Sequence, residues 1–172
     1  DLWNLEDDFK NWLENACTFH NTLVDRIVPG YPKNEIEEYN SKIDYEDNLI
    51  VTAEPFFLWV IEGDDDLRAK LPFHKTYLNV KIVDDMQPFR TLKVRILNGA
   101  HTAMVPFSII YGNQTVRETV DGTFTGNFVK EVISEINSTL DMNPVEIANY
   151  AEEVMDRFRN PFIIHKLSDI AL

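Results

Sequence analysis

The chain has 172 residues and a formal net charge of −13, and 44% of its residues are hydrophobic. Nucleic-acid phosphates would repel so acidic a chain, so we expect no nucleic-acid partner, whereas the hydrophobic fraction suffices for a core. The longest apolar runs fall far short of the roughly 20 residues that span a bilayer, so no membrane partner is expected. A single cysteine, Cys17, excludes an internal disulfide and fits a reducing, cytoplasmic compartment.

The first half of the sequence predicts helices that alternate with strands, as in an α/β layer. Helical or β-type spacing of apolar residues indicates helices over 2–16 and 33–44, and strands or extended runs over 17–19, 49–53, 56–61 and 80–83. Pro55 separates two of these strands, because proline is unfavourable within a central strand. Residues 63–66 predict a solvated acidic turn, since the aspartates lack the spacing of a calcium loop.

From Met86 onward the pattern is helical. Apolar residues at steps of three and four predict a helix from Met86 to about Tyr111, which Pro106 should kink. Asn143 and Pro144 have the residue types of a helix start. Further helices are expected near 114–120, over 128–136, from 144 to about 160, and from 162 onward. We therefore expect an α/β piece over residues 1–85 and a mainly α-helical piece over 86–172, a mixed and helix-rich fold.

Lys93, Asn98 and His101 interrupt the apolar run of the long helix. At about 100° per residue, His101 lies between the other two around the axis, so all three can face one cleft. A titratable amine, an amide and an imidazole on one apolar helix favour chemistry on a carbonyl or an alcohol. The alternative is structural: the lysine extends its amine to solvent, and the histidine is a core residue.

Asp25 and Arg26 are charged residues inside the apolar segment 22–30. Because buried charges need partners, these side chains predict either a structural ion pair, mutual or with other residues, or a binding role. Both interpretations remain open at this point.

Three blocks of the sequence resemble successive blocks of the mannitol dehydrogenase family, the polyol-specific long-chain dehydrogenases and reductases. They are FHNTLVDRIVPG (19–30), TAEPFFLWVIEG (52–63) and KVRILNGAHTAMVP (93–106), and the resemblance covers essentially the whole chain. It implies that residues 1–85 are the C-terminal portion of a dinucleotide-binding domain and that 86–172 are a truncated helical substrate domain. The rest of the N-terminal coenzyme domain, with its Gly-rich phosphate turn, would precede residue 1. An opening without methionine fits this expectation, and the chain alone is expected to be inactive.

The resemblance also implies an NAD-dependent dehydrogenase that needs no metal. Lys93 would be the general acid and base, while Asn98 and His101 would hold and polarise the reacting oxygen. Val24 and Asp25 would contact the substrate. The stretches VDRIVPGYP (24–32) and RFRNPFIIHKLSDIAL (157–172) resemble the members that act on a hexuronate or its aldonate. Members that act on fructuronate or mannitol are the alternatives within the family, and a helical interaction module is the alternative outside it.

Arg90 departs from the family pattern, because mannitol-type members carry an acid three residues before the lysine. We hypothesise that Arg90 is a substrate-binding residue that favours an anionic uronate. A chain with a net charge of −13 would otherwise repel both a sugar acid and a pyrophosphate. Arg90 and burial among Leu92, Ile96 and Leu97 would also favour the uncharged amine that a base requires.

Overall fold

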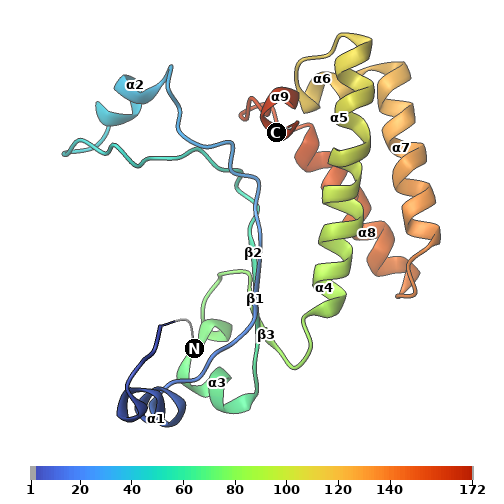
Figure 1. Cartoon of the computed structure of the whole chain (residues 1–172). Helices are drawn as coiled ribbons and strands as arrows, with labels where there is room; N and C mark the ends of the chain where they lie inside the picture. The colour runs from blue at the N-terminus through green and yellow to red at the C-terminus, as the bar shows by residue number, and fades with distance from the viewer. Residues whose placement is uncertain (1–2, 172) are drawn as a thin grey trace.

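The structure is a computed structural model that describes residues 3–171. Figure 1 shows a slender part that holds the sheet, joined to a group of packed helices. The elements in chain order are α1 (Asp7–Ala16), β1 (Thr22–Asp25), α2 (Ile36–Asn40), β2 (Leu58–Glu62), α3 (Asp65–Lys70), η1 (Phe73–Lys75), β3 (Val80–Val83), α4 (Gln87–Leu92), η2 (Lys93–Asn98), α5 (Gly99–Tyr111), α6 (Val116–Asp121), α7 (Thr123–Ser138), α8 (Pro144–Phe158) and α9 (Leu167–Ile170).

Within residues 3–171 the sheet has three strands in the order β1-β2-β3. β1 runs antiparallel to β2 with Asp25 opposite Leu58, and β3 runs parallel to β2 with Val80 opposite Trp59. Val60 in the central strand is fully buried, whereas Val24 on the edge strand is 55% exposed. The expected α/β piece followed by a helical piece is confirmed.

Several expected elements of the first half are wrong or shorter than predicted. Residues 17–19 are not a strand. The residues after Glu62, which would have to pair with them, form α3 instead. Residues 49–53 contribute only a bridge between Thr52 and Gly30, on an excursion that carries the short helix α2 at its tip (Figure 1). The expected turn at 63–66 instead begins α3, where the Asp64 side chain accepts from the Leu67 N–H and caps the helix.

The N-terminal helix is confirmed as α1 but is shorter than predicted: it begins at Asp7, residues 3–6 are not helical, and Leu2 lies outside the described residues. No residue of α1 is buried. Phe9 and Trp12 are 46% and 57% exposed, with ring centroids 5.8 Å apart. The apolar face of α1 therefore has no covering element within residues 3–171.

The long helix after Met86 is confirmed, but its middle is not α-helical. Between α4 and α5 lies η2, a π-helical stretch in which the Gly99 N–H bonds to the Val94 carbonyl five residues back. The helix ends at Gly112, whose φ of 108° is accessible to glycine at little cost. Hydrophobic periodicity cannot distinguish the two helix types over so short a stretch, and π segments are frequent at functional sites.

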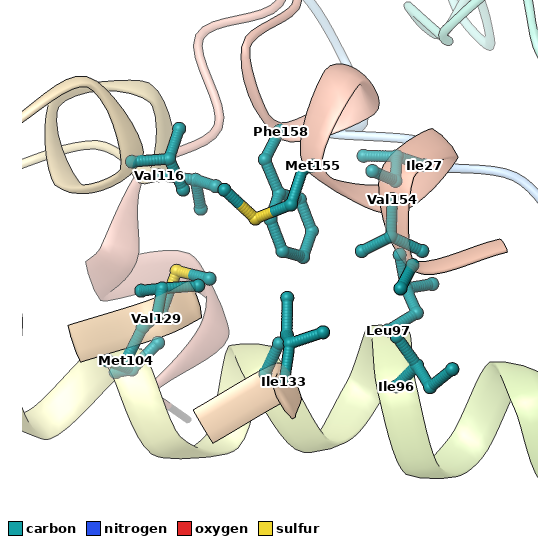
Figure 2. Packing of buried hydrophobic residues seen from close by; sticks show 14 of the residues in the cluster. Ile27, Ile96, Leu97, Met104, Val116, Val129, Ile133, Val154, Met155 and Phe158 are labelled. Atoms are coloured by element: carbon teal, nitrogen blue, oxygen red, sulfur yellow. The ribbon is translucent and has the colours of Figure 1, made fainter. Parts of the chain in front are cut away.

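The helical part has one hydrophobic core, in which Ile96, Met104, Val129 and Val154 are almost completely buried (Figure 2). Ile27 belongs to the same core, so the segment after β1 is anchored among the helices. No helix among residues 3–171 combines the length and the apolar character needed to cross a bilayer.

Local signals account for the helices around this core. The expected start of α8 is confirmed, because the Asn143 side chain accepts from the Val145 N–H. α6 begins with a capping box between Thr115 and Glu118. The helix expected from residue 162 is limited to α9, because the backbone at 165–167 instead hydrogen-bonds residues 114–116.

Candidate active site

Lys93 joins the long helix to the edge of the sheet. Its Nζ donates to the backbone carbonyl oxygen of Val24 at 2.8 Å, and the side chain is half-buried. A carbonyl oxygen only accepts, so it engages one N–H of the amine. In the neutral form, the lone pair must then point away from Val24. The contact therefore orients the amine between the two parts of the chain.

Asn98 lies five residues after Lys93, at the end of η2, and its side chain is exposed. A turn closed by an i→i+5 bond takes more residues than an α turn. Asn98 is therefore closer to Lys93 around the helix axis than the α-helical rule predicts. Its contact with a reacting oxygen stays a prediction.

The His101 ring packs between Phe158 and His165, with centroid distances of 4.6 and 5.1 Å. Its Nε2 atom is buried and has no hydrogen-bond partner among the described residues. Burial lowers the pKa of His101 to about 3, and the charges of His165 and Arg157 act in the same direction. The imidazole is therefore neutral near pH 7, and its contact with a reacting oxygen stays a prediction.

This lowered pKa predicts a pH-dependent stability. Unfolding returns His101 to its ordinary pKa of about 6.5, so between about pH 6.5 and 3 the unfolded chain binds a proton that the folded chain does not. The free energy of unfolding should therefore fall with decreasing pH by up to about 1.4 kcal/mol per pH unit from this residue. Urea titrations at several pH values between 7 and 4 should show that the free energy of unfolding falls less steeply with decreasing pH in His101→Phe than in the wild type. An equal dependence on pH in the two proteins would contradict the prediction.

Asp25 lies in a buried group that we call the Arg157 cluster: Asp25, Glu54, Tyr150 and Arg157. Arg157 Nη2 and Nη1 lie 2.7 and 3.1 Å from Asp25 Oδ1 and Oδ2. Its Nη2 and Nε also donate to Glu54, at 2.7 Å to Oε1 and 3.1 Å to Oε2. The carboxylates are 0% and 1% exposed, and the guanidinium lies 4.1 Å from the centre of the Phe56 ring.

The Tyr150 hydroxyl completes the cluster by donating to Asp25 Oδ2 at 2.6 Å. Burial and the charge of Asp25 raise the pKa of Tyr150, so the hydroxyl keeps its proton and remains a donor. Both oxygens of Asp25 thus have protein partners. Because neighbouring side chains of a strand point to opposite faces, Val24 is exposed while Asp25 is buried.

The structure shows which partners Asp25 and Arg26 have. The two side chains do not pair with each other: Arg26 Nε donates to the Glu54 backbone carbonyl at 2.9 Å, and Asp25 pairs with Arg157. Asp25 is therefore in a structural ion pair, and its partner is Arg157 and not the neighbouring Arg26. Contacts of Val24 and Asp25 with substrate hydroxyls stay a prediction.

Sequence reasoning missed Arg157, Glu54 and Tyr150. The signal for Arg157 is its position in α8, three residues after buried Val154 and directly before buried Phe158. A charge on that apolar face requires a buried opposite charge. The sequence offers many carboxylates, so it cannot identify Asp25 and Glu54 as the partners.

Arg90 lies on α4, three residues before Lys93, with an exposed side chain. A groove of about 600 Å³ opens nearby between the sheet and helices α4 and α8, and Phe89, Leu92 and Tyr150 contribute to its wall. None of the six predicted site residues lines this groove. It is therefore not the cleft that the sequence predicted.

Comparison with known proteins relates this architecture to a class of two-domain dehydrogenases. The family model described as "Mannitol dehydrogenase Rossmann domain" matches residues 2–75, and "Mannitol dehydrogenase C-terminal domain" matches residues 85–172. The chain is thus a Rossmann-type α/β segment followed by a helical domain. It belongs to the mannitol dehydrogenase family.

Among curated proteins, the chain is similar to the altronate oxidoreductases of Bacillus subtilis and Phocaeicola vulgatus, at 49% and 42% identity. The matches cover 99% and 100% of this chain but 35% and 36% of those proteins. The chain therefore spans about a third of the length of the curated relatives it matches.

Two solved structures share the fold. One is the Pseudomonas fluorescens mannitol 2-dehydrogenase in a ternary complex with NAD and D-mannitol, at a TM-score of 0.71 and 23% identity, covering 95% of this chain and 33% of that one. The other is a substrate-free D-sorbitol dehydrogenase, at a TM-score of 0.72 and 25% identity, covering 95% and 34%.

Proposed function

We propose that this chain is part of an NAD-dependent oxidoreductase that interconverts tagaturonate and altronate, with Lys93 as its general acid and base. The names of the curated relatives, at 42–49% identity over nearly the whole chain, support the reaction. The structural observation that carries the proposal is the contact between Lys93 Nζ and the Val24 carbonyl. It holds a lysine amine where the sheet meets the helical part.

In the proposed oxidation, the neutral amine of Lys93 accepts the proton of the substrate hydroxyl. The substrate carbon that carries this hydroxyl loses a hydride in the same reaction. In the reduction, the ammonium returns the proton to the carbonyl oxygen. Because Val24 engages one N–H, the lone pair takes one of the two remaining positions on the nitrogen, both of which point away from Val24. The Asn98 amide and the neutral His101 imidazole would donate to the developing alkoxide. In an oxyanion-stabilising site, the loss of one such donor raises the activation free energy by about 3 kcal/mol.

NAD, when bound, would take or supply the hydride. The 172 residues contain no G-x-G-x-x-G turn, so we assign no residue of this chain to the coenzyme pyrophosphate. The ranges of the two family models support a division into 1–85, the end of the coenzyme domain, and 86–172, the substrate domain. The single thiol of Cys17 supports a cytoplasmic location.

The proposed reaction is tested by assaying the full-length protein with tagaturonate, fructuronate and fructose, each with NADH and NADPH. We expect the highest kcat/KM with tagaturonate and NADH. A preference for fructuronate or fructose would assign the protein to another reaction of the family. No turnover of any of the three would favour an interaction module.

Arg90 predicts a second outcome of the same assay. Reversing its charge in Arg90→Glu should lower the ratio of kcat/KM for tagaturonate over fructose by about tenfold, because an exposed carboxylate one turn from Lys93 repels a uronate but not a neutral sugar. Arg95→Glu is the matched control, since the Arg95 guanidinium instead contacts Thr139 at 3.0 Å. An unchanged ratio in Arg90→Glu would exclude Arg90 as the specificity residue.

A further inference from the structure

The Arg157 cluster holds the segment that supplies the acceptor for Lys93. Four consecutive residues, 24–27, each make a contact to a distant segment of the chain. The Val24 carbonyl accepts from Lys93, and the Asp25 carboxylate binds Arg157. The next two contacts both go to Glu54: Arg26 Nε bonds its carbonyl, and the Ile27 N–H bonds its Oε1 at 2.6 Å.

Among the described residues, Arg157 is the only member of the cluster that hydrogen-bonds both of its carboxylates, Asp25 in this segment and Glu54 outside it. It extends from α8, which also packs against η2, the stretch that contains Lys93. The same helix thus packs against the stretch that contains the lysine and binds the strand end that holds its amine. The guanidinium is suited to this task because it presents several N–H groups in a rigid plane, which a lysine ammonium cannot do.

We infer that Arg157 is a positioning residue for Lys93, acting through Asp25 and the Val24 carbonyl, with Tyr150 as its auxiliary. This inference rests on the proposed function, because it assumes that Lys93 transfers the proton. Arg157 fixes both Asp25 oxygens, and the carbonyl that binds the amine precedes Asp25 by one peptide unit. A shift of the Asp25 side chain therefore moves the Val24 carbonyl and with it the amine.

Two conservative variants of the full-length enzyme test the inference. Arg157→Lys keeps the charge but loses the paired contacts, so we expect kcat to fall by about 10- to 100-fold with KM for the coenzyme unchanged. Tyr150→Phe removes only the bond to Asp25 and should lower kcat by about three- to tenfold. Arg159→Lys is the matched control at the end of the same helix, because the Arg159 side chain pairs with exposed Asp156. It should leave kcat unchanged.

A double-mutant cycle with Lys93→Ala separates positioning from general structural damage. Residual turnover of Lys93→Ala, raised by added methylamine, is compared with that of Lys93→Ala/Arg157→Lys and Lys93→Ala/Tyr150→Phe. If Arg157 acts through Lys93, the second substitution has no further effect in this background. Equal losses of kcat in both backgrounds would overturn the inference, as would unchanged kcat in the single variants.

The cycle also keeps the two proposals distinguishable. If Arg157→Lys does not fold, the test uses Tyr150→Phe alone: its effect on kcat is compared in the wild-type and in the Lys93→Ala background. A large effect of Lys93→Ala combined with equal losses in both backgrounds overturns the inference alone. Wild-type turnover in Lys93→Ala overturns the proposed function, and the inference with it.

Discussion

Replacing Lys93 with alanine in the full-length protein is expected to lower kcat for the proposed altronate oxidation by about 10²- to 10⁴-fold, the usual contribution of a general acid or base. The fold should persist, because the half-buried side chain makes one hydrogen bond to the described residues, to the Val24 carbonyl. The measurements are kcat at saturating altronate and NAD, and the melting curve of the variant. A melting temperature within a few degrees of wild type would show that the loss is chemical.

Arg95→Ala is the control for the Lys93 variant. Arg95 lies in the same π-helical stretch, but its guanidinium contacts Thr139 after α7 and not the sheet. It should retain wild-type kcat. Small primary amines should restore part of the activity of Lys93→Ala, since they can occupy the space of the missing side chain and carry the proton. A kcat for Lys93→Ala within a few-fold of wild type would contradict its role and favour a structural lysine.

Replacing Arg157 with methionine should destabilise the protein by about 3–5 kcal/mol, the typical cost of breaking a buried ion pair by removing one partner. The substitution would leave the carboxylates of Asp25 and Glu54 buried without their cation. Their remaining donors are the Tyr150 hydroxyl and the Ile27 N–H. The free energy of unfolding from urea titrations measures the loss.

A compensated variant checks the cause of this destabilisation. Adding Asp25→Asn and Glu54→Gln to Arg157→Met removes the unpaired charges, so most of the lost stability should return. Arg159→Met is the surface control and should change stability by less than about 0.5 kcal/mol, because its partners Asp156 and Asp121 both lie at the surface. A loss below about 1 kcal/mol in Arg157→Met, or no recovery in the triple variant, would contradict a buried-charge mechanism.

The parts of the fold that the sequence predicted well have strong local signals. The strand at Val80–Val83 and the start of α8 at Asn143 were predicted at their observed positions. The capping side chain and the apolar stripe of a helix act within a few residues of each other, so neither depends on the rest of the fold. The long helix after Met86 follows the same rule.

The failures occur where a distant partner decides the structure. Residues 49–53 have β-type composition, but in the described part of the chain their pairing is limited to one bridge at Thr52. Residues 17–19 lack a partner because the chain after Glu62 becomes α3. The π-helical stretch η2 is also invisible to a periodicity argument, since one altered turn does not change the pattern of buried residues.

The sequence by itself determined which chemistry the chain offers: an amine, an amide and an imidazole on one apolar helix, in blocks that identify the family. Only the tertiary structure decided which groups meet those side chains. Asp25 and Arg157 are 132 positions apart, and Lys93 and Val24 are 69 apart. Local propensities carry no information on such pairs, because the partner of a buried charge is set by how the helices pack on the sheet.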